Sequence, residues 1–289
     1  GVDGFFQFAV NGPSWGAASE KFPVSVPSVL GQSPAAALLF RRGDVAEAAA
    51  WVHLENVDLE SQLDFRGTAG ATPAHLDKLR TKDVPADGAG AAEPADTMDP
   101  LAPFVGRVLR KLVEKDGDAM QSADLAKHID RKAKRVTSLD GTLRWDYGLG
   151  LVVIDTPRCQ GATGFLSKAD TIELGDVTVE SGVAFGTILV ISLDGRPLRT
   201  SKRVLVQTMT EERPYGWRTD ASGRITDLGG PPTLIREVSG SVALRKGARL
   251  RKATVLDVHG YPRGKATRRD RAGTLVVDLM PDALYTILE

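Results

Sequence analysis

The stretch that decides the fold of this sequence is Thr142-Leu143-Arg144-Trp145-Asp146-Tyr147-Gly148-Leu149-Gly150-Leu151-Val152-Val153-Ile154-Asp155. Its first part alternates apolar with polar or charged residues, which is the period of a strand with one buried face. Gly148 and Gly150 mark a turn, and a second apolar run follows directly. The stretch therefore predicts a β-hairpin.

Short apolar runs of the same kind continue to the end of the sequence. Turn residues such as Asp194-Gly195 and Gly229-Gly230-Pro231-Pro232 separate them. Seven or more short strands with little helix between them predict an antiparallel β-sandwich, which we assign to residues 139–289. Beyond the hairpin, we expect strands at residues 171–179, 187–193, 203–208, 238–244, 253–258, 274–279 and 284–288.

Residues 1–60 show a different pattern. Residues 2–10 are almost continuously apolar, which is typical of a strand covered on both faces. Residues 33–43 predict a helix, with Ser33 as its cap, Pro34 at its first position and Gly43 as a left-handed stop. A short strand is expected at 51–57. Because domains seldom begin inside a strand, we also expect that sequence upstream of residue 1 has been lost; the alternative is a processed mature N-terminus.

Residues 61–138 connect these two parts. Between residues 67 and 99 the composition shifts to Ala, Gly, Pro and Asp, which predicts a linker or a long loop. Apolar residues then recur every three or four positions from Leu101 to Leu112, so we expect a helix over residues 100–115.

The composition excludes several classes of protein. Lys+Arg and Asp+Glu are equal at 37 each, so no overall field directs the chain to nucleic acid or to an anionic membrane. No apolar run approaches the roughly 18–20 residues of a membrane-spanning helix. Cys159 is the single cysteine and the four histidines are scattered, so we expect no internal disulfide, no metal site and no cofactor.

The loop that follows the first apolar run carries the first candidate site. If residues 1–50 form a β/α unit of a barrel, this loop lies on the catalytic face. Asn11, Trp15 and Glu20 would then face a sugar, because an indole stacks on a pyranose while an amide and a carboxylate bind its hydroxyls. The alternative is that Trp15 packs the loop and Glu20 is solvated.

Two segments of this region resemble a known family. Residues 1–8 (Gly-Val-Asp-Gly-Phe-Phe-Gln-Phe) and 16–22 (Gly-Ala-Ala-Ser-Glu-Lys-Phe) are similar to the last barrel strand and loop of clan A glycoside hydrolases, most of all the family 42 β-galactosidases. In that family a similar segment carries a glutamate and a histidine that hold the sugar. Glu20 matches the glutamate, but Pro23 stands where the histidine would be, so this half of the contact is not carried over.

The C-terminal part also resembles β-domains that follow the barrel in large bacterial glycoside hydrolases, through residues 143–146 (Leu-Arg-Trp-Asp), 154–158 (Ile-Asp-Thr-Pro-Arg) and 160–161 (Gln-Gly). The resemblance implies an α+β fold class: the end of a (β/α)8 or TIM-barrel catalytic domain at residues 1–60, a linker and helical segment at 61–138, and an accessory β-sandwich at 139–289. It further implies export of the parent enzyme, to the periplasm or the medium.

The same resemblance places the catalytic machinery outside the chain. Hydrolysis with retention needs two carboxylates about 5–5.5 Å apart. In clan A barrels they follow the fourth and seventh strands, which would both lie upstream of residue 1. The chain alone is therefore expected to bind carbohydrate without hydrolysing it.

Tyr215 and Trp217 form a second candidate sugar contact, in a loop where exposure is expected. Three hypotheses stay open: a fragment of a glycoside hydrolase, a complete carbohydrate-binding module without catalysis, and a structural or adhesion β-protein. Neither the glycan nor the oligomeric state follows from the sequence.

Overall fold

The computed structural model describes residues 26–58, 99–114, 120–121 and 123–289, which fall into two compact units. Unit 1 is formed by residues 47–144, and unit 2 by residues 26–46 together with 145–289. Residues 26–46 thus belong with the C-terminal strands, although the sequence had suggested a separate domain over residues 1–60. The strand expected at residues 2–10 lies outside the described residues.

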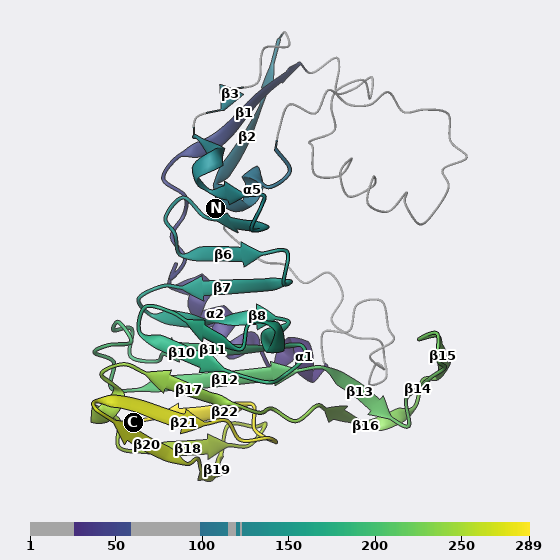
Figure 1. Ribbon diagram of the computed structural model, residues 1–289, viewed down its shortest axis with the longest axis vertical. Coiled ribbons are helices and arrows are strands. Elements are labelled where there is room, and N and C mark those ends of the chain that lie inside the picture. Colours follow the sequence, from purple (N-terminus) through teal and green to yellow (C-terminus); the bar gives the residue numbers. More distant parts are fainter. Residues whose placement is uncertain (1–25, 59–98, 115–119, 122) are drawn as a thin grey trace. The chain divides into compact units, whose positions relative to one another are not determined.

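Unit 2 is built on two antiparallel sheets (Figure 1). Seven consecutive strands of the larger sheet belong to it, in the order β19 (Pro262–Lys265), β18 (Ala253–Leu256), β22 (Tyr285–Leu288), β12 (Val204–Thr210), β11 (Gly186–Ser192), β8 (Cys159–Gly164) and β7 (Leu151–Asp155). The smaller sheet has the order β20 (Arg268–Arg271), β21 (Thr274–Asp278), β17 (Ser241–Leu244), β10 (Val177–Glu180) and β9 (Thr171–Glu173).

The main core of unit 2 lies between these sheets. Ile188 and Val190 of β11 face it from the larger sheet, and Val242 and Leu275 face it from the smaller one. Two short 3-10 helices, η2 (Leu166–Lys168) and η3 (Gly247–Arg249), add Leu166 and the adjoining Leu250 to the core. This arrangement confirms the β-sandwich that the alternating sequence predicted.

A helical layer covers the outer face of the larger sheet (Figure 1). The helices are α1 (Pro27–Leu30) and α2 (Ser33–Arg41). Ala35 of α2 packs with Cys159, Leu189 and Ile191 in a second apolar cluster. Because β11 contributes to both clusters, it is buried on both faces, and its run of apolar residues shows no alternation.

The ends of α2 only partly follow the local sequence signals. The helix ends in a Schellman motif: the amide of Asp44 donates to the carbonyl of Leu39, and left-handed Gly43 donates to that of Phe40. The predicted Ser33 cap is wrong, because the N-cap residue is Gln32 and no neighbouring side chain caps the helix. Instead Gln207 of β12 reaches the free amide of Ala35 from the sheet, at 3.0 Å.

Most of the predicted strands are confirmed. The quoted stretch forms β6 (Leu143–Asp146), which spans the boundary between the two units, and β7. The strand expected at residues 171–179 is interrupted, because residues 174–176 turn the chain between β9 and β10.

Unit 1 contains a small mixed sheet. The strands β1 (Trp51–Asp58) and β2 (Arg107–Val113) run parallel, and β3 (Met120–Gln121) is antiparallel to β1. The other elements in the described part of unit 1 are α5 (Ala102–Val105), η1 (Leu125–Lys127) and the hairpin of β4 (Ile129–Asp130) and β5 (Arg135–Thr137). The strand expected at residues 51–57 is confirmed as β1.

The helix expected over residues 100–115 is wrong. Only Ala102–Val105 is helical, and Gly106 then adopts an extended conformation with φ −170° and ψ −162°. A side chain at this position would collide with Val52 and Leu139, so the close packing around Gly106 requires a glycine. The chain continues as a strand because β1 offers it a parallel partner.

Candidate functional site

A two-stranded arm leaves the sandwich between β12 and β17 and carries the second candidate site (Figure 1). Its base is β13 (Glu212–Tyr215) paired with β16 (Gly230–Ile235), and its tip is β14 (Arg218–Thr219) paired with β15 (Ile225–Asp227). The sequence had placed Tyr215 and Trp217 in a loop, whereas Tyr215 ends a strand and Trp217 occupies the following turn.

The pairing register separates the two faces of the arm. Glu212 and Pro214 are buried, and the alternate residues Arg213 and Tyr215 are exposed on the other face. Tyr215 has 64% of its surface accessible. The guanidinium of Arg213 lies over the ring of Trp217, with Cζ 5.6 Å from the ring centroid, which is a cation–π contact. Arg213, Tyr215 and Trp217 together define what we call the aromatic face of the arm.

Tight turns hold this face in place. The amide of Trp217 donates to the carbonyl of Pro214 at 3.1 Å. Gly229 has a φ of +65°, and a side chain there would meet the carbonyl oxygen of Tyr215. At the tip, Asp220 accepts hydrogen bonds from the hydroxyl and amide of Ser222 and the amide of Arg224, which lower the pKa of its carboxyl.

The base of the arm is fixed to α1. The carboxylate of Glu212 accepts a hydrogen bond from the amide of Ser28 at 2.7 Å, in the first turn of this short helix. Beside it, a cavity of about 360 Å³ opens between α1 and the arm. Its wall combines Phe185, Met209 and Val29 with the polar residues Thr187, Thr210, Gln32, Glu211 and Arg213.

Arg213 connects the aromatic face with the cavity, because its guanidinium lies over the ring of Trp217 and the residue also lines the cavity. Its guanidinium also lies 3.8 Å from Glu211, which pairs with Arg236 at 3.1 Å. An apolar wall with a few charged and hydroxyl groups, near the exposed ring of Tyr215 and the half-buried ring of Trp217, suits a ligand that has both apolar faces and hydroxyls.

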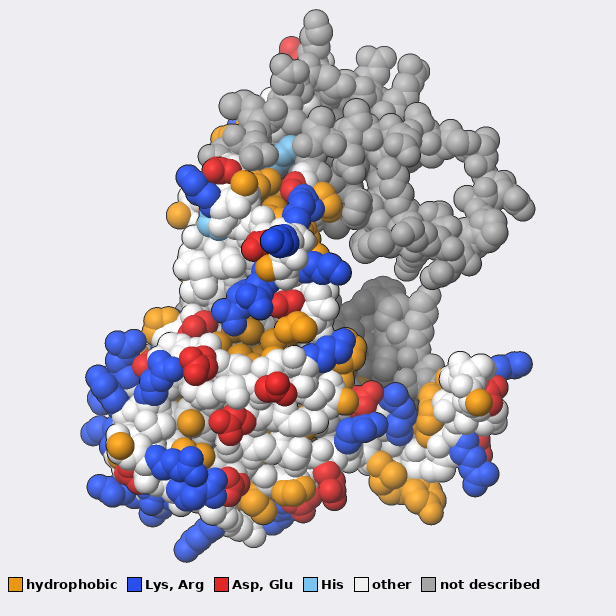
Figure 2. All heavy atoms as spheres, viewed as in Figure 1, with side chains coloured by type: hydrophobic (Ala, Val, Ile, Leu, Met, Phe, Trp, Pro, Cys, Tyr) orange, Lys and Arg blue, Asp and Glu red, His pale blue; other side chains and the backbone are white. Residues whose placement is uncertain are grey.

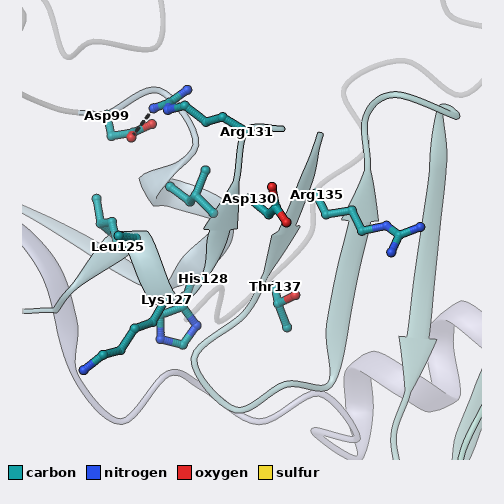
Figure 3. Close-up of a pocket in the computed structure, with 10 residues that line it drawn as sticks. Asp99, Leu125, Lys127, His128, Asp130, Arg131, Arg135 and Thr137 are labelled. Carbon is teal, nitrogen blue, oxygen red and sulfur yellow. Dashed lines mark hydrogen bonds and ion pairs between the residues drawn. The ribbon is translucent and has the colours of Figure 1, made fainter. Parts of the chain in front are cut away.

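A second cavity lies in unit 1 and has a volume of about 740 Å³ (Figure 3). Leu125 and Ile129 form its apolar part. Arg131 reaches toward Asp99 and pairs with it, whereas Arg135 points away from the other labelled side chains (Figure 3). Asp130 accepts a hydrogen bond from the amide of Ala133 at 2.8 Å. Both carboxylates thus already have partners in the surrounding chain.

A buried ionic cluster in unit 2 has a structural role. The side chain of Asp44 is fully buried, 2.7 Å from Nε of Arg158 and 3.1 Å from Nε of Arg42. Arg42 also donates to the carbonyl of Ser192 at 2.6 Å, which ties the end of α2 to the larger sheet. Next to this cluster, burial and then the charge of Asp44 raise the pKa of the Cys159 thiol to about 12. At neutral pH this buried thiol is therefore protonated, which disfavours a role as a nucleophile.

Two further classes of site find no support within the described ranges. No three His, Cys, Asp or Glu side chains there gather closely enough to hold a metal ion. No helix there is long and apolar enough to cross a membrane.

The structure describes only some of the predicted site residues. Asn11, Trp15 and Glu20 lie outside the described residues, so their role stays a prediction. The structure brings Tyr215 and Trp217 onto one arm and adds Arg213, which the sequence did not single out as a ligand. The only local signal is its place two residues before Tyr215, which puts both side chains on one face of a strand.

We compared the chain with protein-family models, with curated proteins and with solved structures, and none of them matches it.

Proposed function

We propose that the chain binds polysaccharide as the C-terminal part of a glycoside hydrolase, whose (β/α)8 barrel and catalytic carboxylates lie outside the described residues. The observation that carries this proposal is the aromatic face of the arm: Tyr215 is exposed, and Arg213, which lies over Trp217, also lines the cavity beside α1. An exposed tyrosine ring is suited to stack on a pyranose, and a guanidinium donates to its hydroxyls.

Three buried carboxylates of unit 2 have structural partners, which favours a binding role over a catalytic one. Asp44 is neutralised by two arginines, and Glu212 accepts the amide of Ser28. Asp176 lies 3.5 Å from Arg199. Each of these groups holds elements of the fold together. A binding module that does not belong to a hydrolase has the same requirements and is the second candidate, favoured by the self-contained sandwich core.

The proposal can be tested by titrating the 289-residue chain with soluble neutral glucans, xylans, mannans and galactans in a calorimeter. Tyr215→Ala and Trp217→Ala should each weaken binding about tenfold, or about 1.4 kcal/mol. Tyr261→Ala is the matched control, since Tyr261 is 69% exposed in the turn between β18 and β19. Equal affinities for all three variants, or no binding to any of these glycans, would refute the aromatic face as a sugar site.

A reducing-end assay on the same samples tests the catalytic part of the proposal. We expect binding without release of reducing ends. Sustained hydrolysis by the pure chain would show that the carboxylates lie within it and would overturn this part alone.

A further inference from the structure

The charge of the chain is concentrated in one segment. Residues 245–271 contain ten Lys and Arg but only two Asp and no Glu, although the two signs balance at 37 each over the whole chain. The remaining residues therefore carry an equal excess of acidic groups. The net charge of zero is therefore the sum of a strongly basic segment, residues 245–271, and a net acidic rest of the chain.

The register of the strands brings much of this segment to one end of the sandwich. Residues 245–252 cross from β17 to β18 beside the start of β21, because Leu244 pairs with Leu275. Arg271 pairs with Thr274 at the hairpin next to Leu275. In the larger sheet, Lys265 pairs with Thr254, near the start of β18. Arg245 of these segments donates to the carbonyl of Gly175. We call the other exposed cations of these segments the basic rim; they are Lys246, Arg251, Lys252, Lys265 and Arg271.

The cations of the basic rim are not neutralised by neighbouring acids. Two other arginines of the segment are paired, Arg263 with Asp282 and Arg269 with Asp278. The rim residues have no ion pair within the described part of the chain. Figure 2 shows Lys and Arg side chains gathered over the region of β18, β19 and β20, with fewer acidic side chains between them.

Protection of sheet edges explains only part of this pattern. The strands β19 and β20 are the edges of their sheets, and charges on an edge discourage pairing with another chain. Lys246, Arg251 and Lys252, however, lie in the crossover between β17 and β18 and not on an edge strand. The five unpaired cations of the basic rim repel one another. A ligand that carries anionic groups would remove this repulsion, so the basic rim is suited to bind such a ligand.

We propose that the basic rim binds an acidic polysaccharide, a chain of pyranose rings that carry sulfate or carboxylate groups. The choice of a polysaccharide rests on the proposed function. It is also favoured over single-stranded nucleic acid because residues 245–252 and 265–271 contain no aromatic residue, and base stacking on aromatic rings is a main contribution to such binding. Tyr261 lies at the opposite end of the β18–β19 hairpin from Lys265.

The test compares polymers that differ mainly in charge. The full chain is titrated at two salt concentrations with dextran sulfate, neutral dextran, alginate and single-stranded DNA. The rim variant combines Lys252→Gln, Lys265→Gln and Arg271→Gln. The matched control combines Lys132→Gln, Arg144→Gln and Arg224→Gln, which removes the same charge from exposed residues of other elements.

We expect dextran sulfate, alginate or both to bind more tightly than neutral dextran, and the affinity for the acidic polymers to fall with salt. The rim variant should lose at least about tenfold and the control variant much less, because only the rim cations contact the polymer. Binding of sulfate or carboxylate polymers alone would identify the anionic group. Binding of DNA as tightly as the acidic glycans would overturn the polysaccharide assignment, and equal losses for both variants would overturn the rim itself. Neither failure affects the test of Tyr215 and Trp217 with neutral glycans.

Discussion

Gln207 is the residue whose replacement should reveal how residues 26–46 are held on the sandwich. Its side chain is fully buried in β12. It accepts a hydrogen bond from the amide of Ala35 at 3.0 Å and donates one to the carbonyl of Gln32 at 3.1 Å. It therefore caps α2 from another layer of the fold. Gln207→Met keeps the length of the side chain but removes both hydrogen bonds.

The expected loss follows from the two backbone groups left behind. Ala35 is buried, so its amide loses its partner without access to water, at a cost of about 1–3 kcal/mol. The carbonyl of the half-buried Gln32 can bind water instead and should cost little. We expect a loss of about 2 kcal/mol in the free energy of unfolding, or a decrease in Tm of about 4–8 °C for a unit of this size.

Amide hydrogen exchange distinguishes a loosened helix from a general loss of stability. If α2 opens about 2 kcal/mol more easily, exchange of its amides should become about 30-fold faster, while the strands of the main core stay protected. The matched control is Gln160→Met, because Gln160 is equally buried in the same sheet but accepts the amide of Asp176. Unchanged protection at Ala35 in Gln207→Met, or equal effects of the two variants on α2, would refute the reasoning.

Three further predictions concern unit 2. Cys159, with a pKa of about 12, should react with a thiol reagent at pH 8 only after unfolding; rapid labelling of the native chain would contradict its burial. At Asp194, burial opposes ionisation, but hydrogen bonds from Lys202, Ser201, Ser192 and Arg196 outweigh it and lower the pKa to about 2. The ionised Asp194 contributes fully to the free energy of unfolding above its unfolded pKa of about 3.9, and this contribution is lost as pH falls through about 2. We therefore expect Asp194→Asn to lower the free energy of unfolding by about 1 kcal/mol at pH 7, a value discounted for the exposure of the side chain, and by nearly nothing at pH 2. Urea titration at the two pH values measures the difference. Gly164→Ala, at a φ of +126° and against the carbonyl of Gly150, should cost about 3 kcal/mol or prevent folding, whereas Gly195→Ala, in open space, should cost less than half as much.

Local sequence patterns predicted the sandwich because the burial of each strand determines its pattern of apolar residues. Alternation marks β6 and β10, and an unbroken apolar run marks β11, which is buried on both faces. The end of α2 was equally predictable, since Gly43 and Asp44 complete a motif of neighbouring residues. Its beginning was not, because the group that caps it is 172 residues away in sequence.

The failure at residues 100–115 has a similar cause. Val108 and Leu112 fit a helical period but are exposed in β2, so the apolar spacing did not report a buried face. The chain is a strand there because of pairing with β1, a partner that no local pattern reveals. For the site, aromatic residues among Gly and Pro pointed to Tyr215 and Trp217. The contribution of Arg213 depends on strand register and on the cavity beside α1, neither of which a sequence shows.

The packing of α2 on the larger sheet has a consequence for folding on the ribosome. The amide of Ala35 and its partner on Gln207 are separated by 172 residues, so synthesis at about 5–20 residues per second leaves the helix without its sheet for about 10–30 s. During this time Leu38 and Leu39, which later pack against the second apolar cluster, have no partner strands. A nascent chain arrested before β12 should therefore be sensitive to proteolysis at residues 26–46 and bound by chaperones, and both should end once β12 and β22 have emerged.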